Sequence, residues 1–285
     1  MVDAIAEDSE PLMPSILVTG ISSGIGEAVA RHFADDGWVV IGTVRDASRF
    51  DPSAFAGDVH AESLDLSVEG SASALTERVL SAYGCPDVVV NNAGTLQWGP
   101  VELASAAEIE SIYRVNVFSQ IELIRGFVPA MRERGSGTIA NVTSLGGRMV
   151  FPFFTIYNST KHALEGFSEG LWHELKPFGI RVKAIEPGFV QTAIWDKTLR
   201  DASGRTKAGP PPYTEYMATM AEFERSISKR TSSSDAAKEV CAAIMDDSDR
   251  LRYPIGAYAR PILRARRVFG DQFMMRFFHK RWMGA

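Results

Sequence analysis

The sequence has few cysteines and no long apolar run. Its two cysteines, Cys85 and Cys241, lie far apart and lack the dense pairing pattern of a disulfide-stapled secreted domain. No stretch reaches the roughly 18 to 20 consecutive apolar residues that a membrane-spanning helix requires. The formal net charge of −5 offers no broad positive surface to nucleic acid. The low cysteine content, the lack of a long apolar run and the negative net charge predict a soluble protein of the reducing cytoplasm that binds neither DNA nor RNA.

We expect residues 1–14 not to be a secretory signal. Residues 1–14 contain acidic residues and no basic one, whereas such a signal begins with basic residues. We expect residues 1–14 to be a disordered leader. The rest of the chain, with 45% hydrophobic residues overall, can bury one large core. We predict one catalytic domain over 15–258, with a loop insertion at about 189–230, followed by an extension over 259–285.

Short apolar runs alternate with longer amphipathic ones, which is typical of a parallel sheet covered by helices on both faces. This pattern predicts a single doubly wound α/β domain of the Rossmann type with about seven strands, whose ligands lie at the carboxyl ends of the strands. The expected strands are 15–19, 38–44, one near 63–65, 87–91, 138–143 and 181–186. The expected helices are 25–36, 71–83, two long stretches before Arg134, and 156–176.

A glycine-rich turn, Thr19-Gly20-Ile21-Ser22-Ser23-Gly24-Ile25-Gly26, lies between the first strand and the first helix. Gly20 suits a tight turn, Gly24 lets backbone approach a pyrophosphate, and Gly26 lets helix and strand pack closely. The helix N-terminus then offers free N–H groups to an anion. The turn can also be a simple connection, and its spacing departs from the G-x-G-x-x-G pattern.

Further motifs follow this turn in a fixed order. They are Asp65, Asn91-Asn92-Ala93-Gly94, Asn116, Ser144, Tyr157-Asn158-Ser159-Thr160-Lys161 and Pro187-Gly188-Phe189-Val190-Gln191-Thr192. Together they resemble the short-chain dehydrogenase/reductase family, and the resemblance spans roughly residues 15–192. The glycine turn and Thr43-Val44-Arg45-Asp46 are closest to the 17β-hydroxysteroid and retinol dehydrogenase subgroup. The resemblance implies hydride transfer between a nicotinamide cofactor and an alcohol or carbonyl, and a homodimer or homotetramer.

Tyr157 and Lys161 are four residues apart, so a helix places them on one face. A neighbouring ammonium group favours the phenolate, so we expect Lys161 to lower the pKa of Tyr157. By resemblance, Tyr157 is the general acid/base, Ser144 binds the reacting oxygen and Lys161 also binds the nicotinamide ribose. Asn116 is expected to hold a water on the proton path, or to have a structural role only.

Cofactor choice depends on the residue at the end of the second strand. An acidic residue there would bind the ribose 2′-hydroxyl, but Val44, the last residue of the strand, occupies this position by alignment, and Arg45 with Ser22 can bind a 2′-phosphate. NADP(H) is therefore preferred, while Asp46 keeps NAD(H) possible. The expected cofactor-binding residues are Gly20, Ser22, Ser23, Gly24, Ile25, Gly26, Arg45, Asp65, Leu66, Asn92, Ala93, Gly94, Tyr157, Lys161, Pro187, Gly188, Val190 and Thr192.

The segments that shape the substrate pocket in this family are unusually apolar here. They favour a bulky hydrophobic alcohol or ketone, although some of these side chains must belong to the core. The expected pocket residues are Trp98, Met149, Phe151, Phe154, Phe189 and Trp195, with further apolar side chains at Leu96, Val150, Phe153, Ile194, Tyr213, Tyr216, Met217, Met220 and Phe223.

The last 26 residues carry seven basic residues against Asp271, a net charge of +6, which leaves −11 for the rest of the chain. Four phenylalanines and Trp282 make this extension amphipathic. It could touch an anionic membrane surface, but packing on the pocket or on a partner subunit is favoured.

Two other functions remain open: a non-catalytic NADP-binding regulator, and an epimerase or lyase on a related scaffold. Intact Ser144, Tyr157 and Lys161 disfavour the first, and the glycine spacing disfavours the second. His162 and His173 have no partners at metal-ligand spacing, so no metal is expected.

Overall fold

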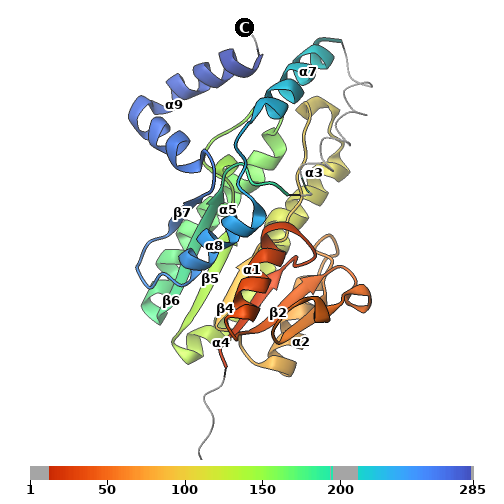
Figure 1. The fold of residues 1–285 in the computed structure, drawn as a ribbon, viewed down its shortest axis with the longest axis vertical. Helices are drawn as coiled ribbons and strands as arrows, with labels where there is room; N and C mark the ends of the chain where they lie inside the picture. Colours follow the sequence, from red (N-terminus) through yellow and green to blue (C-terminus); the bar gives the residue numbers. More distant parts are fainter. Residues whose placement is uncertain (1–12, 193, 195–210, 284–285) are drawn as a thin grey trace, which may run out of the picture.

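The computed structural model describes residues 13–192, 194 and 211–283 (Figure 1). Most of the predicted leader, Trp195 and residues 196–210 of the predicted insertion therefore lie outside the described residues. The strands are β1 Ser15–Thr19, β2 Val39–Val44, β3 Val59–Ser63, β4 Val88–Asn91, β5 Gly137–Val142, β6 Ile180–Pro187 and β7 Arg252–Ile255. The helices are α1 Gly24–Asp35, α2 Ser71–Tyr83, α3 Ala106–Tyr113, α4 Ser119–Arg134, α5 Thr155–Leu175, α7 Pro211–Ser226, α8 Ser233–Ile244 and α9 Ala259–Met283.

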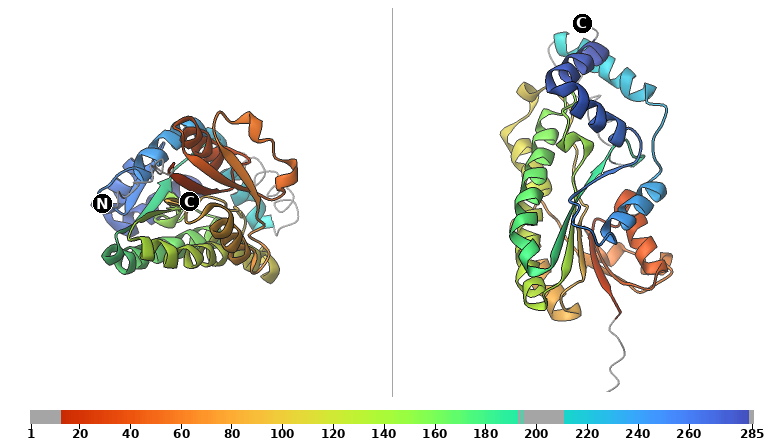
Figure 2. Two further views of the ribbon diagram at one scale, coloured as in Figure 1. Left: turned by 90° about the horizontal axis from the view of Figure 1, so that it is seen from below. Right: turned by 90° about the vertical axis from the view of Figure 1, so that its left-hand side faces the viewer.

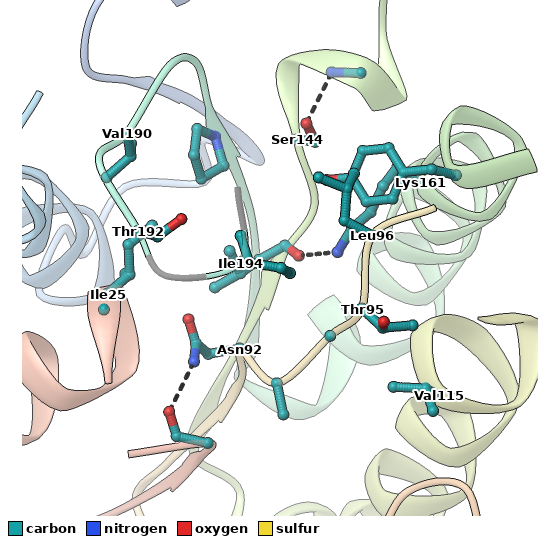
Figure 3. A pocket seen from close by; sticks show the side chains of 18 of the residues that line it. Ile25, Asn92, Thr95, Leu96, Val115, Ser144, Lys161, Val190, Thr192 and Ile194 are labelled. Atoms are coloured by element: carbon teal, nitrogen blue, oxygen red, sulfur yellow. Dashed lines mark hydrogen bonds between the residues drawn. The ribbon is translucent and has the colours of Figure 1, made fainter. Parts of the chain in front are cut away.

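The strands form one parallel sheet in the order β3-β2-β1-β4-β5-β6-β7. The chain therefore builds outward from β1 to β3 and then returns to place β4 on the other side of β1. Ligands of such sheets bind where the strand order reverses, beyond the carboxyl ends of the strands. A cavity opens at this edge (Figure 3). The predicted fold class is confirmed.

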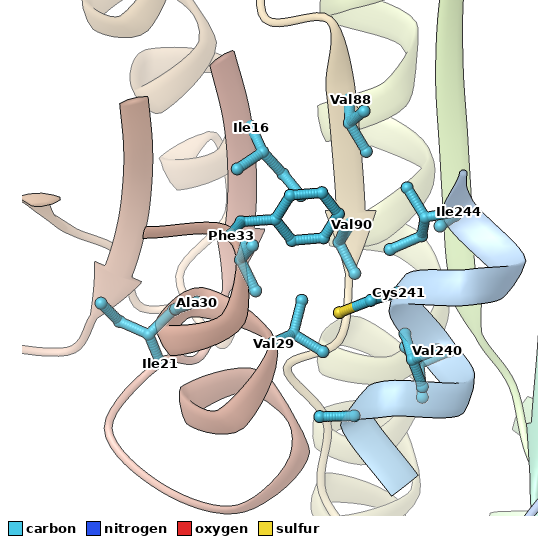
Figure 4. Packing of buried hydrophobic residues seen from close by; sticks show 14 of the residues in the cluster. Ile16, Ile21, Val29, Ala30, Phe33, Val88, Val90, Val240, Cys241 and Ile244 are labelled. Atoms are coloured by element: carbon cyan, nitrogen blue, oxygen red, sulfur yellow. The ribbon is translucent and has the colours of Figure 1, made fainter. Parts of the chain in front are cut away.

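Helices cover both faces of the sheet (Figure 2). On one face, Val29 and Phe33 of α1 pack against Val240 and Cys241 of α8 (Figure 4). On the other face, α2, α4 and α5 bury a second apolar cluster that includes Phe127. These helices form because their apolar residues recur at helical spacing and find a sheet face to cover. The two clusters hold the strands so that their carboxyl ends remain in register.

The third strand lies earlier than the sequence predicted. It covers Val59–Ser63, whereas Leu64 and Asp65 follow it in the loop. This strand is at the edge of the sheet and only Val59 within it is buried, so it lacks the continuous apolar run by which central strands are found. The shift leaves Asp65 beyond the strand, at the edge of the cavity.

The described parts of the predicted insertion and extension lie beyond the cavity end of the sheet. An isolated bridge between Val190 and Thr231 joins the two sides of the insertion, and α7 lies within it. Helix α9 is interrupted at Gly270, where φ is 77° and ψ is 168°. Within the described part of the chain, no helix is both long and apolar enough to cross a membrane.

Candidate active site

A cavity of about 660 Å³ lies beyond the carboxyl ends of the central strands. Its wall is formed by the glycine-rich turn, the loops after β2 to β6 and the start of α5. Figure 3 shows part of this wall, including Asn92, Ser144 and Lys161. Most residues expected at the site line this one space. They are Gly20, Ser22, Ser23, Gly24, Ile25, Arg45, Asp65, Leu66, Asn92, Ala93, Gly94, Trp98, Ser144, Phe151, Phe154, Tyr157, Lys161, Pro187, Gly188, Phe189, Val190 and Thr192.

The glycine-rich turn leaves room for a phosphate at the start of α1. Gly20 and Gly24 have φ values of +77° and +69°, which side chains rarely adopt. A Cβ on Gly26 would lie 2.2 Å from the carbonyl oxygen of Gly20, so only glycine fits beneath the turn. Ser23 precedes α1 with no side-chain cap bond, which leaves its hydroxyl and the first N–H groups of the helix available to an anion. The residues present fit a dinucleotide pyrophosphate.

Hydrogen bonds between β1 and the loop after β4 support the glycine-rich turn. The Thr19 hydroxyl accepts bonds from the backbone N–H groups of Asn92 and Ala93, at 2.9 and 3.0 Å. The Asn92 side chain donates to the carbonyl of Thr19 at 2.9 Å. These bonds explain why the loop after β4 begins with asparagine, because a side-chain amide can join two adjacent strand ends.

Arg45 and Asp46 have different surroundings at the end of β2. Arg45 lines the cavity, whereas Asp46 does not. Asp46 begins a short 3₁₀ turn and accepts bonds from the N–H and hydroxyl groups of Ser48, at 3.1 and 2.6 Å. Asp65 lines the cavity near Arg45, and its bonds from Ser67 lower its pKa, with a small contribution from Arg45.

Tyr157 and Ser144 lie together on the cavity wall. Ser144 begins a 3₁₀ turn after β5, and its hydroxyl accepts a bond from the N–H of Gly146 at 2.9 Å. Tyr157 is in the first turn of α5. Burial raises the pKa of Tyr157, and a hydrogen bond with Ser144 opposes this rise. The turn after β5 thus places the Ser144 hydroxyl beside the Tyr157 phenol, which belongs to α5.

Lys161 lies one turn after Tyr157, and its buried side chain lines the cavity. Its Nζ donates to the carbonyl of Val142 at 2.8 Å. Burial lowers the pKa of Lys161 to about 8, and the charge of Glu165 offsets this lowering only in part. The predicted lowering of the Tyr157 pKa is not found: burial raises this pKa, and the contribution that opposes the rise comes from the Ser144 hydrogen bond.

Asn116 is buried in a π-helix that separates α3 from α4. Its side chain accepts a bond from Thr95 N–H at 2.8 Å and donates to the Thr95 carbonyl at 2.9 Å and to Thr160 at 3.1 Å. All these bonds are to protein atoms, and Asn116 does not line the cavity. The side chain thus fixes the loop after Gly94, while the widened helical turn is a feature that recurs at functional sites.

Aromatic side chains form the opposite end of the cavity. Trp98 and Phe154 stack at 6.1 Å between ring centres, and Phe151 and Phe189 lie at 6.0 Å. Met149 was expected here, but it packs in an apolar cluster with Met274 and Phe278 and does not line the cavity. Trp195 and the side chains of Met220 and Phe223 lie outside the described residues. Leu96 and Ile194 do line the cavity. Residues that the sequence did not predict also line it, among them Ser111, Val115, Leu145, Asn158 and Ile227.

Two buried carboxylates, Glu165 and Glu186, pair with two partly exposed arginines behind the site. Glu186, just before Pro187, pairs with Arg148 at 3.0 Å. Arg252 of β7 pairs with Glu165 at 3.0 Å and approaches Glu186 at 3.7 Å. Burial and the charge of Glu165 raise the pKa of Glu186 to about 7, although both arginines oppose this. Single-sequence reasoning had no signal for this network, because its members come from four separate elements.

Comparison with known proteins decides the family. The family model "short chain dehydrogenase" matches residues 14–203, and these contain the whole glycine turn and Ser144, Tyr157 and Lys161. The chain belongs to the short-chain dehydrogenase family. It is an oxidoreductase with a Rossmann-type fold, and the predicted resemblance is confirmed.

The relatives of this short-chain dehydrogenase differ in substrate. It is 32% identical over 211 residues to 3-ketodihydrosphingosine reductase of Bacteroides thetaiotaomicron, covering 74% of this chain and 77% of the relative. It is 37% identical over 195 residues to human 17-beta-hydroxysteroid dehydrogenase type 1, covering 65% and 59%. A short-chain dehydrogenase structure from Streptomyces avermitilis matches with a TM-score of 0.78 and 30% identity, over 96% of this chain and 97% of that one.

Solved neighbours hold either nicotinamide cofactor. L-Sorbose reductase from Gluconobacter frateurii was solved with NADPH (TM-score 0.71, 28% identity, 85% of this chain and 94% of that one). A 3-ketoacyl-(acyl-carrier-protein) reductase from Brucella melitensis was solved with NADH (TM-score 0.69, 25% identity, 85% and 96%). Among the described residues, no group of three or more His, Cys, Asp or Glu side chains is arranged to hold a metal ion.

Proposed function

We propose that this short-chain dehydrogenase uses NADP(H) to interconvert a bulky hydrophobic alcohol and its carbonyl compound. The observation that carries the proposal is one cavity lined by Ser144, Tyr157 and Lys161, by a glycine-rich phosphate turn, and by Arg45. The bound cofactor supplies or accepts the hydride. The enzyme's own residues bind, orient and protonate the substrate.

Tyr157 is proposed to be the general acid/base. In reduction, its hydroxyl gives a proton to the carbonyl oxygen, and in oxidation the phenolate takes it back from the alcohol. A phenol is protonated at neutral pH and burial raises the pKa of Tyr157 further, so the acid form that reduction requires is present. Ser144 donates a hydrogen bond to the same oxygen. Lys161 is proposed to hold the nicotinamide ribose through the buried ammonium group beside the cavity.

The preference for NADP(H) is supported by Arg45, which lines the cavity with an exposed guanidinium group. A guanidinium can form paired bonds to a 2′-phosphate. The Asp46 carboxylate caps a short 3₁₀ turn by accepting hydrogen bonds from Ser48. It therefore does not compete with Arg45 for the adenosine ribose. A relative named NADPH-dependent 3-dehydrocapnine reductase is 31% identical over 222 residues.

The hydrophobic substrate is supported by the aromatic end of the cavity, formed by Trp98, Phe151, Phe154 and Phe189. A pocket with an apolar body and one polar focus selects substrates of the same character. Relatives named for a ketodihydrosphingosine and for hydroxysteroids are consistent with this class.

The proposal is tested by measuring NADPH and NADH binding and then turnover with a panel of hydrophobic and small polar carbonyl compounds. We expect tighter binding of NADPH and turnover of hydrophobic ketones. Arg45→Asp should reverse the cofactor preference, whereas Arg49→Asp, an exposed neighbour that does not line the cavity, should not. Equal binding of both cofactors by the unchanged enzyme would overturn the NADP(H) preference.

A further inference from the structure

Helix α9 is anchored to the cavity wall by one face. After the interruption at Gly270, Met274 and Phe278 are buried, with 4% and 7% of their surface exposed. They pack in the apolar cluster that contains Trp98 and Phe154. The packing predicted for the extension therefore accounts for these two side chains. Figures 1 and 2 show α9 at the same end of the molecule as α7, beyond the carboxyl ends of the strands.

The outer face of α9 is apolar and uncovered. Phe269, Phe273 and Phe277 are 59%, 51% and 51% exposed. Their rings lie 5.0 Å apart between Phe269 and Phe273, and 6.5 Å apart between Phe273 and Phe277. We call these three residues the phenylalanine stripe. Val268 and Met275 beside it are 75% and 65% exposed. An aromatic surface of this size in water marks an interaction site.

Basic residues flank the phenylalanine stripe. Arg264, Arg267, Arg276 and Lys280 are exposed, and none of them forms an ion pair within the described residues. The last 26 residues carry a net charge of +6, and the remainder carries −11. Unpaired cations around an exposed apolar stripe match the surface of an anionic bilayer, where rings enter the headgroup boundary and cations remain outside it.

Aromatic contacts connect the stripe with the cavity. Phe277 contacts Phe278 at 5.4 Å between ring centres, and Phe278 contacts Phe151 at 6.0 Å. Phe151 in turn lies 6.0 Å from Phe189, and both line the cavity. A row of packed aromatic rings thus links the exposed face of α9 to the proposed substrate pocket.

We propose that the outer face of α9 docks on the surface of an anionic lipid membrane and that the enzyme takes its hydrophobic substrate from there. The inference of docking depends only on the phenylalanine stripe and the flanking cations. The inference that the substrate comes from the membrane rests on the proposed function. A second copy of the chain fits the stripe poorly, because a two-fold contact through α9 would bring its cations against each other.

The test uses the full chain and vesicles of phosphatidylcholine, alone or mixed with phosphatidylglycerol. Co-sedimentation with the mixed vesicles, weakening as salt is raised, is expected. Phe273→Ser/Phe277→Ser should weaken vesicle binding at least about tenfold. The matched control is Phe178→Ser/Met245→Ser, which removes two apolar side chains, 44% and 53% exposed, from the opposite end of the sheet. This control should bind vesicles as the unchanged protein does.

Three results would overturn docking. The first is that the unchanged protein does not bind the mixed vesicles. The second is that both double variants lose vesicle binding equally. The third is that the protein forms a concentration-dependent dimer, which the stripe variant abolishes, and does not bind vesicles. NADPH binding and turnover of a water-soluble carbonyl compound are measured in the same variants. These should be unchanged in the stripe variant, so a failure of docking and a failure of the proposed reaction are read separately.

Discussion

Arg148 and Glu186 form an ion pair behind the cavity, with Nη1 of the arginine 3.0 Å from Oε1 of the carboxylate. Arg148 directly follows the 3₁₀ turn that Ser144 begins, and Glu186 directly precedes Pro187 and Gly188. The pair therefore joins the segment that carries a proposed catalytic hydroxyl to a segment expected to bind the cofactor.

Arg148→Met should destabilise the protein by about 2 kcal/mol, because the buried Glu186 loses its nearer partner. The free energy of unfolding in urea measures this. The added replacement Glu186→Gln should recover part of the loss, since no buried charge is then left unpaired. Lys238→Met breaks the exposed pair with Asp235 and serves as control, with an expected change below about 0.5 kcal/mol. Equal losses at the two sites would contradict this account.

Glu186 should also make stability depend on pH. Its pKa is raised from 4.5 to about 7 in the folded state. Between these values the folded protein keeps a proton that the unfolded chain has lost, so stability falls as pH rises, by at most about 1.4 kcal/mol per pH unit. Glu186→Gln should flatten this part of the curve of unfolding free energy against pH. An unchanged slope in the variant would show that Glu186 is not the titrating group.

Glu165 should tune the charge of Lys161. Burial lowers the pKa of Lys161 to about 8 and Glu165 raises it. Glu165→Gln should therefore move the alkaline limb of the kcat/KM profile to lower pH, because the ammonium form is lost earlier. Glu169→Gln is the matched control: Glu169 also pairs with Arg252, but it is 55% exposed and does not act on Lys161. A shift of equal size in both variants would contradict the prediction.

Two glycine replacements should have opposite effects. In Gly26→Ala the new methyl group meets the Gly20 carbonyl at 2.2 Å, so the turn must move. We expect lower stability and at least about tenfold weaker NADPH binding. In Gly166→Ala the methyl group has open space on an exposed face of α5, so the variant should gain about 0.5–1 kcal/mol. Thermal unfolding and NADPH titration measure both. A tolerated Gly26→Ala would remove the steric argument for the turn.

The sequence predicted the parts of the site that depend on order and spacing along the chain. Ser144, Tyr157 and Lys161 belong to this group, since a strand end and one helix face bring them to the cavity. It could not place Met149, because only the packing of α9 decides which wall that side chain joins. Val115 and Asn158 line the cavity through tertiary position alone. The direction of the Tyr157 pKa was likewise missed, because burial cannot be read from spacing.

The central claim is that Tyr157 transfers the proton, and the most direct measurement compares Tyr157→Phe with the unchanged enzyme. NADPH binding and the single-turnover rate of NADPH oxidation with a hydrophobic ketone are measured for both. We predict that the variant still binds NADPH, while its single-turnover oxidation rate at saturating NADPH falls by at least about a hundredfold. NADPH oxidation at the unchanged rate in Tyr157→Phe would contradict the account.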